Sequence, residues 1–240
     1  GSWSARLGSN EYFIVEADEY DSAFFDKRSK FIHYFPNILA INNIEFDHAD
    51  IFDDLTPILK QFSHLLRTIP ANGQVVFHEN DQTTKHLVDK ENWFDVYSIG
   101  NDKQFYYDET KNLFIFNGKE YDLDELPFFG EHNYKNALMA MCLAYLCDVP
   151  YEESFQALKN YTGVKRRLEV IFHGNTHLVY DDFAHHPTAI EAVSEAIKSK
   201  YASKMIGIIE LASNTMKSGR HGNTLIAVSY THLRAHETQR

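Results

Sequence analysis

Two short apolar runs in this sequence each lead directly into side chains that can bind a metal ion. Residues 12–15 run into an acidic cluster that begins with Glu16, and residues 38–41 run into a segment that ends in His48. Runs rich in Ile, Val and aromatic residues predict buried strands, and ligands of α/β sheets gather beyond the carboxyl ends of such strands. A carboxylate and a neutral imidazole leave coordination positions of Mg²⁺ open for phosphate oxygens. We expect a Mg²⁺ site here, although the acidic cluster alone also fits a solvated strand end and His48 alone a hydrogen-bonded surface or core histidine.

A pair of asparagine residues lies at the start of a predicted helix. Asn133 and Asn136 are one helical turn apart, so their side chains share a face. Asn133 alone would fit an ordinary helix cap. Together, the two amides have the donors and acceptors needed to read the edge of an adenine. The pattern leaves both interpretations open.

A second polar cluster, residues 180–187, follows a predicted strand. Asp182 stands where that strand ends, a position that suits the hydroxyl groups of a ribose. His185 and His186 can be metal ligands, substrate contacts or ordinary loop residues. Arg167 belongs to a basic pair between two α/β units, where a guanidinium can hold phosphate across a cleft or stay solvated.

The elements that must position these residues predict an α/β fold. Strands at residues 38–41 and 73–77 alternate with helices at residues 53–67 and 82–90, which is typical of a mainly parallel sheet. Asn117 and Gly118, between two alternating runs, predict the turn of an antiparallel β insert. Helices at residues 137–146 and 152–160 follow.

The pattern then restarts near Leu168, which indicates a second, Rossmann-like unit. We expect strands at residues 168–172, 177–182 and 205–211 and a helix at residues 188–201. The boundaries are therefore a central domain at 1–167, a C-terminal domain at 168–227 and a tail at 228–240. The tail matches one reading frame of a common sequencing adapter, so we expect it to be non-native.

Composition narrows the class of protein. The chain has 240 residues, 44% of them apolar, and a formal net charge of -11, with no long Lys/Arg stripe to bind nucleic acid. It has no run of apolar residues long enough to span a bilayer and no signal peptide, so we expect a cytoplasmic protein. Cys142 and Cys147 lie in one apolar helical stretch, which fits core residues rather than a disulfide.

An ordered set of motifs resembles the Mur ligases, the ATP-dependent amide-forming enzymes of peptidoglycan synthesis. These motifs are residues 16–19, 42–48, 130–137, 166–169 and 181–187. Residues 20–31 and 213–217 are similar to the branch of the family that attaches L-alanyl-γ-D-glutamyl-meso-diaminopimelate to UDP-N-acetylmuramate in cell-wall recycling. The alternative within the family is the branch that adds L-alanine.

The resemblance implies a reaction with ATP and Mg²⁺ as cofactors. ATP would phosphorylate the muramate carboxylate, and an amine would then attack the acyl phosphate. By their place in the motifs, Glu16 and His48 would bind Mg²⁺ and Arg167 would reach the ATP phosphates, so that these three residues serve catalysis. Some relatives have a carbamylated lysine where this chain has Ser63, so no such group is expected.

The resemblance also implies which residues meet the nucleotide and the substrates. Asn133 and Asn136 would contact adenine, and Asp182 the ribose. The substrates, UDP-N-acetylmuramate and a murein tripeptide, would meet His185, Ser213, Asn214 and Lys217. No nucleic acid, membrane or obligate protein partner is implied.

The sequence departs from the family in two places. The Gly-Lys-Thr phosphate loop and the UDP-binding domain before it have no counterpart in this chain, so we expect a piece of the enzyme that is inactive alone. Leu211 and Ala212 stand where the family carries Pro-Arg, which removes one expected substrate contact.

Two hypotheses for the function lie outside the ligase class. The chain could be a metal-dependent phosphohydrolase or a nucleotide-binding module without catalysis. The hydrolase would use Asp47, His48, His185 and His186 as a two-metal site. The binding module would take up adenosine without turnover.

Overall fold

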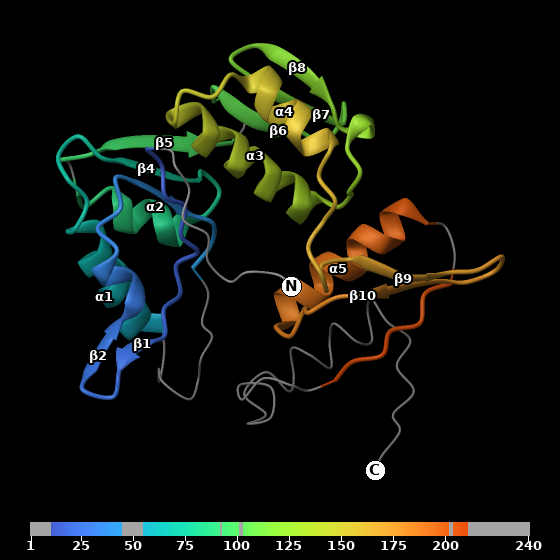
Figure 1. The fold of residues 1–240 in the computed structure, drawn as a ribbon, viewed down its shortest axis with the longest axis horizontal. Coiled ribbons are helices and arrows are strands. Elements are labelled where there is room, and N and C mark those ends of the chain that lie inside the picture. Colours follow the sequence, from blue (N-terminus) through green and yellow to red (C-terminus); the bar gives the residue numbers. More distant parts are fainter. Residues whose placement is uncertain (1–10, 45–54, 92, 101–102, 202–203, 211–240) are drawn as a thin grey trace.

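The computed structural model describes residues 11–44, 55–91, 93–100, 103–201 and 204–210. Figure 1 shows a central body, which holds the elements up to residue 163, and a smaller C-terminal unit beside it. Residues 164–168, here called the linker, join the two parts. The predicted tail at 228–240 lies outside the described residues.

A parallel sheet forms one half of the central body. Its strands are β3 (Ile38–Ile41), β4 (Gln74–His78) and β5 (Asp95–Ile99), in the order β3-β4-β5, and they alternate with α1 (Leu55–Leu66) and α2 (Gln82–Val88). The strands and helices predicted for residues 38–90 are confirmed. The sequence did not predict β5, whose first residues are exposed and polar and therefore lack the apolar run of a buried strand.

An antiparallel sheet and two helices form the other half. The strands β6 (Phe105–Asp108), β7 (Leu113–Phe116) and β8 (Lys119–Asp122) pair in sequence order, and α3 (Glu131–Leu146) and α4 (Tyr151–Lys159) pack against them. Asn117 and Gly118 join β7 to β8 with φ values of 51° and 80°. These left-handed conformations suit a tight hairpin, so the predicted turn is confirmed.

The long helix α3 joins the two halves. Its residues contact β3, β4 and β6, and Leu138 and Cys142 are completely buried. Burial raises the pKa of the Cys142 thiol to about 12, whereas Cys147, just after the helix, is partly exposed. The two cysteines are free thiols, as expected from the sequence.

A small hairpin precedes the parallel sheet. It consists of β1 (Asp21–Ala23) and β2 (Asp26–Ser29), and a 3-10 turn, Lys30–His33, follows it. The strand predicted at residues 12–15 is wrong, because these residues form no ladder and Ile14 is 93% exposed. A strand is stabilised by hydrogen bonds to a neighbour, and no described strand pairs with this segment.

The C-terminal unit contains β9 (Glu169–His173), β10 (Leu178–Asp181) and α5 (Pro187–Lys200), near the predicted positions. The two strands pair antiparallel as a hairpin. Within residues 204–210, the predicted strand does not form: Met205 and Ile209 pack on Ile190 of α5, but Ile208 is 97% exposed. The alternating apolar residues pack one face of the segment on α5, and none of the described strands pairs with it. The structure is a mixed α/β fold, as predicted.

Candidate functional site

A cleft of about 2500 Å³ lies between the central body and the C-terminal unit. The carboxyl ends of β3 and β4, the first turns of α3, the linker and the start of α5 line it. The predicted residues that line this cleft are Glu16, Asn133, Asn136, Arg167, Asp182 and His185. The other predicted site residues, His48, Ser213, Asn214 and Lys217, lie outside the described part of the chain.

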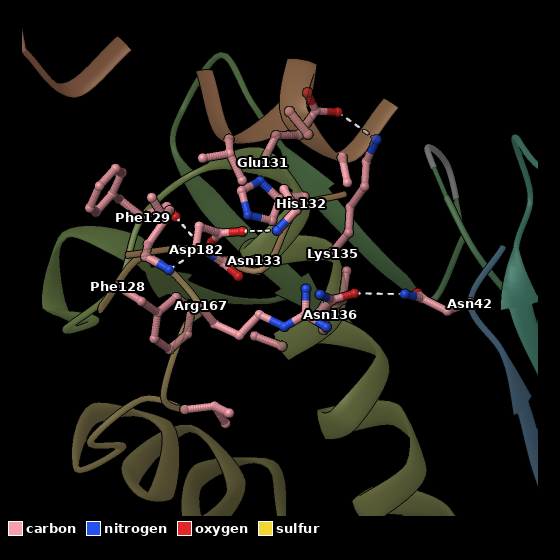
Figure 2. A pocket seen from close by; sticks show the side chains of 18 of the residues that line it. Asn42, Phe128, Phe129, Glu131, His132, Asn133, Lys135, Asn136, Arg167 and Asp182 are labelled. Atoms are coloured by element: carbon pink, nitrogen blue, oxygen red, sulfur yellow. Dashed lines mark hydrogen bonds and ion pairs between the residues drawn. The ribbon is translucent and has the colours of Figure 1, made fainter. Parts of the chain in front are cut away.

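The first turn of α3 approaches α5 closely because Gly130 precedes it. Gly130 is the N-cap and has a φ of 95°, and a Cβ placed there would lie 2.6 Å from the Cβ of Ala196. Asn133 is therefore a residue of the helix and not its cap, and the capping interpretation is wrong. The Nδ2 of Asn133 donates to the carbonyl oxygen of Phe129 at 2.8 Å, which leaves its Oδ1 as an acceptor toward the cleft (Figure 2).

Asn136 is held by a hydrogen-bonded chain of side chains that the sequence did not predict. The Nδ2 of Asn42, just beyond β3, donates to the Oδ1 of Asn136 at 2.8 Å (Figure 2). The Oδ1 of Asn42 lies 3.2 Å from the Nε2 of His78, at the end of β4. Both residues follow the rule that site residues sit at the carboxyl ends of parallel strands, which is the signal that could have found them.

The electrostatics around His78 favour a neutral imidazole. Burial lowers the pKa of His78, and the nearby charge of Lys135 lowers it further. Because the Nδ2 of Asn42 donates to Asn136, its Oδ1 faces His78 and accepts from a ring protonated at Nε2. Asn136 consequently has its oxygen engaged and its amide nitrogen free to donate to a ligand.

The linker places Arg167 opposite the first turn of α3. Arg167 and Asp182 line the cleft together with His132 and Asn136, as Figure 2 shows from close by. Burial lowers the pKa of His132, the charge of Asp182 opposes that shift, and the charge of Arg167 adds to it. The C-terminal unit thus brings a cation and an anion to the helix that carries the two asparagines.

Asp182 uses both carboxylate oxygens on the backbone of the protein. Its Oδ2 accepts from the N–H of Leu168 at 2.7 Å, and its Oδ1 accepts from the N–H of Ala184 at 2.8 Å. His185 is oriented in turn by the carbonyl oxygen of Phe183, which lies 2.8 Å from its Nδ1. The residues expected to meet ribose and substrate are thus fixed by local backbone contacts.

The metal site stays a prediction. Glu16 is exposed and lines the cleft, but its expected partner His48 is outside the described residues. Among the residues that the structure describes, no group of three or more His, Cys, Asp and Glu side chains could hold a metal ion. Ser63 lies in a separate cavity of about 430 Å³ that residues of α1 and Leu87 of α2 line, and it does not line the cleft.

Residues 4–144 match the model of the Mur ligase middle domain. The chain therefore belongs to the Mur ligase family. A ligase of Haemophilus influenzae named UDP-N-acetylmuramate–L-alanyl-γ-D-glutamyl-meso-2,6-diaminoheptandioate ligase is 44% identical over 225 residues, which are 91% of this chain and 50% of the relative. A ligase of the same name from Escherichia coli is 43% identical and covers 90% of this chain and 49% of the relative.

Solved structures agree with these relatives. A crystal structure of a murein peptide ligase from Psychrobacter arcticus superposes with a TM-score of 0.65 and 36% identity, over 94% of this chain and 49% of that one. A MurF structure from Acinetobacter baumannii has a TM-score of 0.68 at 21% identity, which supports the fold alone. The predicted resemblance to the tripeptide-adding branch is confirmed. The chain spans about half the length of the curated relatives it matches.

No helix in the described ranges is both long and apolar enough to cross a bilayer.

Proposed function

We propose that this chain is part of an ATP-dependent ligase that joins L-alanyl-γ-D-glutamyl-meso-diaminopimelate to UDP-N-acetylmuramate. The observation that carries the proposal is the 44% identity, over 91% of the chain, to a relative named for this reaction. The cleft supports it, because residues from motifs as far apart in sequence as Glu16 and His185 line one cavity. Residues 1–167 would then be the central nucleotide domain and residues 168–227 the C-terminal domain.

The adenine of ATP would bind at the first turns of α3. Asn133 offers an acceptor and Asn136 offers a donor, since Phe129 and Asn42 occupy the complementary groups of the two amides. Adenine presents an amino donor beside a ring-nitrogen acceptor, whereas guanine presents two acceptors on the same edge. The fixed amides therefore favour adenine over guanine.

The phosphates would lie between the linker and Glu16. Arg167 would hold phosphate oxygens, since a guanidinium pairs with them through parallel hydrogen bonds. Glu16 and His48 would hold Mg²⁺, which when bound neutralises the charge on the transferring phosphoryl group. The exposed carboxylate of Glu16 at the cleft wall suits a ligand of a hydrated cation.

The substrate side would be formed by His185, with Ser213, Asn214 and Lys217. Lys217 would provide a positive charge for the carboxylates of the tripeptide, away from the attacking amine. The muramate carboxylate would become the acyl phosphate, and the amine of the tripeptide would displace phosphate. We place this reaction in the cytoplasm, with no obligate protein partner.

The test is amide formation by the full-length protein that carries this chain. With ATP, Mg²⁺ and UDP-N-acetylmuramate present, kcat/KM for the tripeptide should exceed that for free L-alanine. Lys217→Ala should weaken the use of the tripeptide more than that of the muramate substrate. A preference for L-alanine would instead support the alanine-adding branch.

The metal assignment has its own experiment. Glu16→Gln and His48→Ala should each lower turnover by roughly 10²-fold or more, as expected for the loss of a metal contact in phosphoryl transfer. Near-normal rates of both variants at saturating Mg²⁺ would contradict the assignment. Binding of Mn²⁺ at His185 and His186 together would point to the phosphohydrolase instead.

A further inference from the structure

The linker holds Arg167 between two residues in an unfavourable backbone conformation. Arg166 has a φ of 58° and Leu168 a φ of 49°. Side chains with a Cβ seldom adopt these left-handed values, because the Cβ approaches a carbonyl oxygen too closely. Such strain persists only where surrounding contacts impose it, and it concentrates at functional sites.

Asp182 supplies the contact that holds Leu168. Its Oδ2 accepts the N–H of Leu168 at 2.7 Å, and its Oδ1 accepts the N–H of Ala184 at 2.8 Å. One carboxylate therefore joins the linker to the loop that follows β10. A backbone N–H bonded to an ionised carboxylate makes a stronger bond than one between neutral groups.

Arg166 is held by a separate set of contacts. Its N–H donates to the Oε2 of Glu169 at 2.8 Å, and its carbonyl oxygen accepts the N–H of Phe183 at 2.8 Å. Its guanidinium lies 4.8 Å from the ring centre of Phe183 and 3.5 Å from the Oδ2 of Asp181. The side chain of Arg166 is thereby directed onto the C-terminal unit.

Arg167 is different, since its exposed side chain lines the cleft. Its N–H closes a turn by donating to the carbonyl oxygen of Val164 at 3.2 Å. The position of the guanidinium then depends on the backbone on both sides of the residue, and on its far side that backbone is held by Asp182.

We propose that Asp182 is a positioning residue that acts through the backbone of Leu168 to aim Arg167 at the anionic part of the ligand. This role deepens the proposed function and rests on it, because the anion in question is the triphosphate of ATP. It is distinct from the ribose contact that the resemblance implies, since it is exerted on the backbone of the protein.

The experiment is a double-mutant cycle in the full-length protein. Asp182→Ala should lower kcat/KM for ATP by about 10²-fold, the order expected when a catalytic group is displaced by roughly 1 Å. In the background of Arg167→Ala, the same change should have little further effect, because the residue that it positions is already lost. Additive losses would overturn the proposal.

Two controls separate this role from a ribose contact and from simple destabilisation. The ratio of kcat/KM for ATP to that for 2′-deoxy-ATP and 3′-deoxy-ATP should be the same in the wild type and in Asp182→Ala; collapse of either ratio in the variant would assign Asp182 to the sugar. Asp122 accepts a backbone N–H from Asp124 at 2.9 Å outside the cleft. Asp122→Ala loses a comparable bond and should leave turnover unchanged.

A measurement without nucleotide tests the backbone role directly. Trypsin should cut the linker after Arg166 or Arg167 several times faster in Asp182→Ala than in Asp122→Ala, with the products identified by mass. Equal cleavage rates would overturn the proposal. If the wild type shows no ATP-dependent amide formation, the proposed function fails, and the cleavage rates still decide whether Asp182 holds the linker.

Discussion

In the central body Phe114, Phe116 and Leu138 are completely buried, whereas in the C-terminal unit Ile171 and Phe172 of β9 are 59% and 57% exposed. Both regions are rich in apolar residues, so composition does not explain the difference. The strands β6, β7 and β8 have α3 and α4 packed over them, while β9 pairs only with β10 among the described strands. An apolar strand becomes core only where a second layer covers it.

The largest expected change in stability comes from removing an aromatic ring from the central body, with the removal of a ring from the C-terminal unit for comparison. Phe116→Ala should lower the free energy of unfolding by about 3–5 kcal/mol, because it opens a cavity among Phe105, Tyr145 and Tyr151. Phe172→Ala should change it by less than about 0.5 kcal/mol. Urea denaturation of both variants measures the difference, and similar losses would mean that β9 is as well packed as β7.

A glycine substitution tests how closely the two regions approach each other. Gly130→Ala adds a methyl group 2.6 Å from the Cβ of Ala196 and should cost about 1–3 kcal/mol for overpacking, in addition to the backbone strain. Gly118→Ala is the matched control, since Gly118 also has a positive φ but has nothing within 4 Å of the added Cβ. If thermal denaturation gives equal losses for both, the approach of α3 to α5 leaves room for the added methyl group.

The side of the cleft that the central body forms should recognise the adenine base independently of the C-terminal unit. Asn42→Asp replaces the donor that faces Asn136 with an acceptor, so the amide of Asn136 should turn its nitrogen toward residue 42. ATP affinity in the full-length protein should then fall by about 10-fold, since one good base contact is worth roughly 1–3 kcal/mol. Calorimetric titration with ATP and GTP measures this. An unchanged preference for ATP would show that Asn42 does not orient Asn136.

The smallest effect is a pH dependence located in the central body. Burial lowers the pKa of His78 below its usual value in the folded protein. As the pH falls, the unfolded chain therefore binds a proton at this residue more readily than the folded chain does. The contribution of His78 is therefore complete above its unfolded pKa of about 6.5 and is lost as the pH falls toward the lowered folded value. Melting temperatures of the wild type and His78→Gln between pH 8 and pH 5 should converge at the acidic end. Parallel curves would contradict the assignment.

The sequence predicted those elements whose signals are local. The dipeptide of Asn117 and Gly118 predicted a hairpin because these two residue types readily adopt the left-handed conformations that the turn needs. The strands predicted at residues 12–15 and 205–211 do not form within the described residues. Strand formation depends on a neighbouring strand, which an apolar run does not reveal. Local patterns therefore found most elements, but they could not show that these two apolar runs have no described strand to pair with.

The candidate site divides in the same way. Asn133 and Asn136 could be singled out because helical spacing places them on one face. The strand-end rule could point to Asn42 and His78 separately, but not to the hydrogen bond between them, since their separation depends on the sheet. The positive φ at Leu168 has no signature in composition, so the backbone role of Asp182 became visible only in the structure.

The buried thiol of Cys142 on α3 makes it possible to measure how often the core of the central body opens. Alkylating reagents react with the thiolate, and Cys142 is completely buried with its pKa raised to about 12, so we expect modification only when α3 separates from the core around it. Cys147, just past the end of the same helix and partly exposed, gives an internal reference. The ratio of the labelling rates of Cys142 and Cys147 therefore reports how often the central body opens under native conditions. No cysteine has to be introduced for this measurement.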